Sequence, residues 1–170
     1  MKNIYKLALE RHLMPFHIVC ATSLGELATE GALNQGNALL AGKAAGLNLA
    51  QYVKELAKET GEVLPSDPAQ AAEVLIKLIR LSDVYEIEKI SDNRFVVKIK
   101  TDQCKYCPKG VGGAEISGTV CPFPGVIEAF VSDVTGRKIS VILKEMDEKG
   151  VKKTPLLKKN GFCVMEFQVD

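Results

Sequence analysis

The chain has 170 residues, of which 46% are hydrophobic and 25% are charged, and its formal net charge is +1. This balance is typical of one globular domain spanning residues 1–170 and excludes a disordered chain. A net charge so close to zero gives no electrostatic reason to expect a nucleic-acid partner. The basic run at 144–159 is interleaved with acidic residues, which is typical of a solvated hairpin.

The pattern near the N-terminus is not that of a membrane or export segment. No apolar run reaches the roughly 18 residues that a membrane helix needs. Glu10, Arg11 and Pro15 also interrupt the apolar stretch that a signal peptide requires. We therefore expect a cytoplasmic protein with no membrane partner. In that reducing compartment, the odd number of cysteines, five, argues against a disulfide framework and for metal or thiol chemistry.

The first third of the chain is predicted to be helical. Residues 1–34 form an N-terminal helical segment that Pro15 interrupts. One long helix, or two, then extends to about residue 60, where Val53 and Ala57 recur at helical spacing. Gly42 and Gly46 each lower helix propensity by about 1 kcal/mol relative to alanine. They indicate either close helix packing or a break of the helix near residue 36.

The next segments predict a change from helix to sheet. Asp67 and Pro68 begin a helix that ends near Leu81. Alternating apolar residues on both sides of a turn at 91–93 then predict a β-hairpin, and two further strands follow a helix that starts at Pro122. The order predicts an α+β fold. In it, N-terminal helices pack on an antiparallel sheet of about four strands, with a cysteine-bearing loop and a helix between the strand pairs.

Four of the cysteines have the spacing of a metal site. Cys104 and Cys107 are separated by two residues, Cys121 lies at a helix start, and Cys163 falls on the apolar face of the last strand. Two thiolates of a tight loop can bind one ion, and two more complete a tetrahedron with zinc–sulfur distances of about 2.3 Å. We expect these four residues to bind one zinc ion, with iron as the alternative. No catalytic residue is predicted.

Several short motifs resemble the vinyl-4-reductase domain family, which is related to the NO-signalling and Golgi-transport ligand-binding fold. The matching features are Gly42-Lys43-Ala44-Ala45-Gly46, the region of Cys104, Cys121-Pro122-Phe123-Pro124-Gly125, Thr135-Gly136, and Cys163 followed by Phe167 and Val169. The resemblance covers residues 35–170 and implies a domain that binds a small hydrophobic molecule between helices and sheet, with a homodimer by analogy. It does not imply reductase chemistry, because the chain has no dinucleotide fingerprint, flavin motif or catalytic triad.

The helices at 37–57 and 122–131 present more apolar surface than four short strands can cover. A pocket, a dimer interface or a fully packed core could accommodate this surface, and the resemblance favours a pocket. Its predicted lining is Leu49, Val53, Phe95, Val97, Phe123 and Ile127. The function predicted first is a zinc-stabilised binding or sensor module for a small hydrophobic molecule. The alternative is a metal or thiol redox protein, or an enzyme of tetrapyrrole or lipid metabolism, that uses the cysteine site.

Overall fold

The computed structural model describes residues 4–145 and 153–170, and the elements below lie within these ranges. The helices are α1 (Ile4–Glu10), α2 (Pro15–Thr29), α3 (Gln35–Thr60), α4 (Pro68–Leu78) and α5 (Phe123–Thr135). The strands are β1 (Tyr85–Ser91), β2 (Arg94–Lys100), β3 (Ile139–Val141), β4 (Lys144–Glu145), β5 (Lys153–Thr154), β6 (Leu157–Lys159) and β7 (Phe162–Val169). The middle of the hairpin predicted over 144–159 falls outside the described residues.

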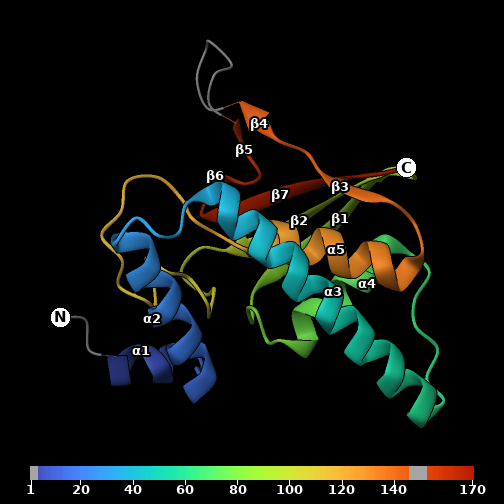
Figure 1. The fold of residues 1–170 in the computed structure, drawn as a ribbon, viewed down its shortest axis with the longest axis horizontal. Coiled ribbons are helices and arrows are strands. Elements are labelled where there is room, and N and C mark those ends of the chain that lie inside the picture. Colours follow the sequence, from blue (N-terminus) through green and yellow to red (C-terminus); the bar gives the residue numbers. More distant parts are fainter. Residues whose placement is uncertain (1–3, 146–152) are drawn as a thin grey trace.

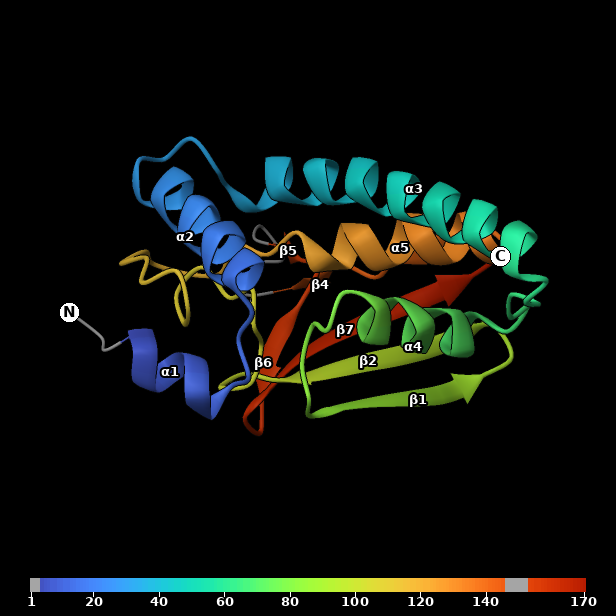
Figure 2. The same ribbon diagram turned by 90° about the horizontal axis from the view of Figure 1, so that it is seen from below.

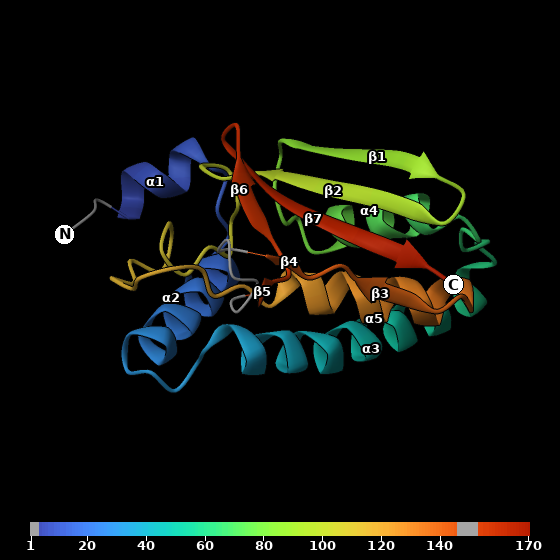
Figure 3. The same ribbon diagram turned by 90° about the horizontal axis from the view of Figure 1, so that it is seen from above.

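Five of these strands form an antiparallel sheet in the order β1-β2-β7-β3, with β6 also paired to β7. Strands β4 and β5 form a separate pair. Helices α4 and α5 cover one face of the sheet, and α3 lies outside α5 (Figures 2 and 3). The predicted α+β fold is confirmed. The described sheet has one strand more than expected, because the short segment β6 joins it.

The sheet is apolar on the face that meets the helices and charged on the other. Phe95 and Phe167 are direct partners in β2 and β7, and their rings stack with centroids 5.0 Å apart. The Lys98 side chain lies on the opposite face of the sheet, where it forms ion pairs with Glu86 and Glu88 of β1. An antiparallel sheet with one buried and one solvated face accounts for the alternation of the hairpin sequence.

Helices α3 and α5 approach each other closely because glycines stand at their crossing (Figure 1). A Cβ atom on Gly42 would lie 2.1 Å from the carbonyl oxygen of Pro122, and one on Gly46 would lie 2.4 Å from that of Val126. Gly125 of α5 faces the backbone of Leu39 in the same way, at 2.2 Å. Of the two explanations for these glycines, close packing is therefore the observed one, and α3 runs unbroken from Gln35 to Thr60.

Helices α1 and α2 lie beside the loop that carries Cys104 and Cys107 (Figure 1). Gly112 in this loop is so close to α2 that a Cβ atom there would lie 2.1 Å from the carbonyl oxygen of Ala21. The guanidinium of Arg11 donates to the carbonyl oxygen of Cys104 at 3.3 Å. No helix within residues 4–145 and 153–170 is long and apolar enough to cross a membrane.

Candidate ligand pocket

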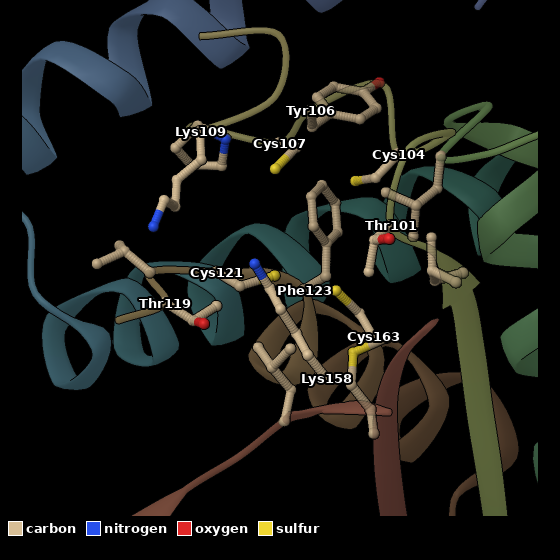
Figure 4. A pocket seen from close by; sticks show the side chains of 16 residues that line it. Thr101, Cys104, Tyr106, Cys107, Lys109, Thr119, Cys121, Phe123, Lys158 and Cys163 are labelled. Carbon is tan, nitrogen blue, oxygen red and sulfur yellow. The ribbon is translucent and has the colours of Figure 1, made fainter. Parts of the chain in front are cut away.

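Four cysteine side chains surround one cavity of about 50 Å³ at the end of the sheet nearest the N-terminal helices (Figure 4). Cys104 and Cys107 belong to the loop after β2, Cys121 precedes α5, and Cys163 lies on β7. Apolar side chains complete most of the wall, namely Leu81, Ile99, Tyr106, Phe123, Leu156 and Met165. The sequence pattern therefore identified residues that share a cavity although they are far apart in the chain.

Backbone hydrogen bonds fix the cysteine loop to the rest of the fold. The N–H of Cys104 donates to the carbonyl of Lys100 at 3.2 Å, which turns the chain directly after β2. The N–H of Gly110 donates to the Cys107 sulfur at 3.2 Å, so this thiol also closes its own loop. At the other side of the cavity, the side-chain amide of Gln35 accepts from the N–H of Cys121 and donates to its carbonyl, both at 3.0 Å.

Aromatic rings connect the cavity wall to both helical layers. The ring of Tyr106 lies 5.3 Å from that of Phe123 at the start of α5, measured between centroids. The Tyr106 hydroxyl donates to the carbonyl oxygen of Ile79 at 2.7 Å, which satisfies a polar group in an apolar region. Tyr106 also contacts His17 of α2. The wall is thus held in place by α2, α5 and the segment after α4.

Burial keeps the thiols of Cys104, Cys121 and Cys163 protonated. It raises the pKa of Cys104 to about 12 and that of Cys163 to about 11, and the nearby Cys107 adds to both shifts. Burial also raises the pKa of Cys121 well above its usual value, outweighing the N–H of Phe123, which favours the thiolate. Because the thiolate is the nucleophile, these three groups behave at neutral pH as small apolar side chains.

The prediction of a zinc-binding protein is wrong for this structure. Among the described residues, no group of three or more His, Cys, Asp or Glu side chains is arranged so that it could hold a metal ion. A tetrahedral zinc site needs four sulfurs at about 2.3 Å from one point. Cys104, Cys107, Cys121 and Cys163 instead lie around the cavity, with Phe123 among the side chains between them (Figure 4). The Cys-x2-Cys spacing does not fix the direction of its thiols.

The six residues predicted to line a ligand pocket occupy two different environments. Phe123 lines the cavity described above. Val53, Phe95, Val97 and Ile127 are buried in the hydrophobic core, and Leu49 packs against that core. The cavity lies beyond these residues, toward the cysteine loop. The helix faces therefore meet the sheet in a packed core, and the open volume is at its end.

A wide groove of about 900 Å³ adjoins the cavity. Thr119, Val120, Leu156 and Lys158 line both spaces and mark the junction between them. Lys158 is not among the predicted site residues, because the basic run that contains it predicts a solvated hairpin. Lys158 in β6 is the direct partner of Cys163 in β7, and no local pattern in the sequence indicates this pairing.

A sequence profile of the MJ0207 family matches residues 31–169, so α1 and α2 precede the matched region. The chain is 30% identical over 110 residues to the protein named "Uncharacterized protein MJ1342" of Methanocaldococcus jannaschii, which covers 65% of this chain and 90% of that protein. It is 24% identical over 120 residues to "Uncharacterized protein MJ0207" of the same organism, covering 71% of this chain and 73% of that protein. None of these matches links the chain to the vinyl-4-reductase domain, and that assignment is not supported.

Proposed function

We propose that this protein, which belongs to the MJ0207 family, is a binding module that holds a small apolar molecule in the cysteine-walled cavity and the adjoining groove. The observation that carries the proposal is that the cavity and the groove are neighbours that share the lining residues Val120 and Leu156. A cavity of about 50 Å³ can hold only the end of a molecule, whereas the groove beside it has room for the remainder.

The chemistry of the wall supports binding rather than thiol catalysis. A reactive cysteine needs a lowered pKa and access to solvent. The pKa values of Cys104, Cys121 and Cys163 are raised instead, and their burial is the main cause. Protonated thiols beside the rings of Tyr106 and Phe123 form a polarizable apolar wall, which suits an aliphatic or aromatic ligand.

The test is a fluorescence titration with the uncharged probe N-phenyl-1-naphthylamine, whose emission rises when it leaves water. We expect saturable binding to the wild-type protein. The variant Val120→Phe narrows the junction of cavity and groove and should weaken binding tenfold or more, about 1.4 kcal/mol. Val63→Phe makes the same change at a side chain that is 95% exposed and should bind the probe as the wild type does.

Two results would overturn the proposal. One is a wild-type protein that does not bind the probe at all. The other is equal affinity in Val120→Phe and Val63→Phe, because the occupied site would then lie elsewhere. Thermal unfolding of both variants verifies that a loss of binding is not a loss of fold.

A further inference from the structure

We infer that the ligand of this pocket carries an anionic group, and that Lys158 binds this group where the cavity joins the groove. This inference rests on the proposed function, because it names the class of ligand that the same site would take. It adds a charged contact to what is otherwise an apolar enclosure.

The position of Lys158 follows from strand pairing. Residue 158 of β6 is the direct partner of Cys163 in β7, so its side chain starts beside one of the cavity thiols. It lines both the cavity and the groove. Figure 4 shows the Lys158 side chain extending from β6 to the side of the pocket where Cys121 and Thr119 lie. Within the described part of the chain, no carboxylate forms an ion pair with it.

Among the described residues, the other charged ones that line the two spaces are two lysines and one glutamate. Lys109 lines the cavity, Lys153 lines the groove, and Glu115 is the acidic residue among the described lining. The Lys109 amine donates to the carbonyls of Ile116 and Gly118, at 2.7 and 3.4 Å, which holds its charge at the rim. The whole chain has a net charge of only +1, so a lining with three lysines and one glutamate is a local excess.

This excess discriminates between ligands of equal apolar area. An anion at the junction would exchange water for a charge-assisted contact with the Lys158 ammonium. An uncharged molecule would gain only from apolar burial, and a cation would be repelled. The pocket is thus expected to select an amphiphile whose carboxylate, sulfonate or phosphate lies next to its apolar part.

A matched pair of probes tests this selection. 8-Anilino-1-naphthalenesulfonate has the skeleton of N-phenyl-1-naphthylamine and differs from it by one sulfonate. In Lys158→Gln we expect the sulfonate probe to bind about 2- to 5-fold more weakly, as loss of one charged contact at an exposed residue implies. The uncharged probe should bind Lys158→Gln with wild-type affinity, and Lys158→Arg should retain the binding of the sulfonate probe.

Lys159→Gln is the control, because it removes the same charge from the adjacent residue of β6, which lines neither space. It should leave both affinities unchanged. Equal losses in Lys158→Gln and Lys159→Gln would overturn the inference, since they would reflect general electrostatic attraction. So would unchanged sulfonate binding in Lys158→Gln. In either case, retained binding of the uncharged probe would leave the proposed function standing.

Discussion

The imidazole ring of His17 meets the ring of Tyr106 edge-on, with centroids 4.9 Å apart, and thereby joins α2 to the wall of the cavity. His17 is fully buried, and its Nδ1 accepts the N–H of Met14 at 2.9 Å, at the start of the helix. This contact requires the unprotonated nitrogen. The packing of α2 against the pocket therefore depends on a neutral histidine.

Acidification should weaken the fold through His17. Burial, and after it the charges of Lys105 and Arg80, lower the pKa of His17 below 6.5, against the opposing effects of the Ile79 carbonyl and Asp83. Below pH 6.5 the unfolded chain therefore binds a proton that the folded chain does not, and the free energy of unfolding falls until the pH reaches the lowered pKa. Above pH 6.5 this contribution is complete. The slope is at most about 1.4 kcal/mol per pH unit.

Urea unfolding at pH 7.5, 6.5 and 5.5 measures this effect. In His17→Gln, the free energy of unfolding should change less between pH 6.5 and 5.5 than in the wild type. His12→Gln changes the exposed histidine and should keep the wild-type change. Equal stability of the wild-type protein at pH 6.5 and 5.5 would contradict a lowered pKa of His17.

Gly42→Ala should destabilise the protein by about 2–4 kcal/mol, because its new Cβ would overlap the Pro122 backbone and push α3 away from α5. The control is Gly36→Ala in the same helix, where the nearest atom is the side-chain oxygen of Asn34, at 3.2 Å. We expect this control to change stability by no more than about 0.5 kcal/mol. Chemical denaturation of the two variants compares them, and equal losses would contradict the close packing of these helices.

The thiols of Cys104, Cys121 and Cys163 should be alkylated slowly. Iodoacetamide reacts with thiolates, and the raised pKa values of Cys104, Cys121 and Cys163 leave few of them at pH 7.5. Cys20 on α2 is exposed and provides an internal reference. Peptide mass spectrometry over time should show modification at Cys20 first, with faster modification of the cavity thiols as the pH rises. Early modification of Cys104 or Cys121 would contradict their raised pKa values.

Local signals in the sequence predicted local structure well. Asp67 caps α4, and its carboxylate accepts the N–H groups of Ala69 and Gln70, both at 3.0 Å, as the sequence at that helix start implies. The β1–β2 hairpin follows from its alternating pattern, because one face of the sheet is buried and the other is solvated. These features depend on residues that are neighbours in the chain.

The site was less predictable because it depends on side-chain directions and on distant pairings. Cysteine spacing indicated that Cys104, Cys121 and Cys163 would meet, but not that they would surround a cavity. Apolar periodicity placed Phe95 and Ile127 on inward faces, yet it cannot distinguish a packed core from a cavity. The pairing of Lys158 with Cys163 joins a basic segment to a strand, and no local pattern predicts it.

The most direct test of the central claim is the protection of the cavity thiols by a bound ligand. Saturating N-phenyl-1-naphthylamine should slow the alkylation of Cys121 and Cys163 by about fivefold or more, because access to the cavity passes the bound probe. The rate at the exposed Cys20 should not change. Equal rates at Cys121 and Cys163 with and without a probe that binds the protein would contradict the account, because the ligand would then occupy a site other than this cavity.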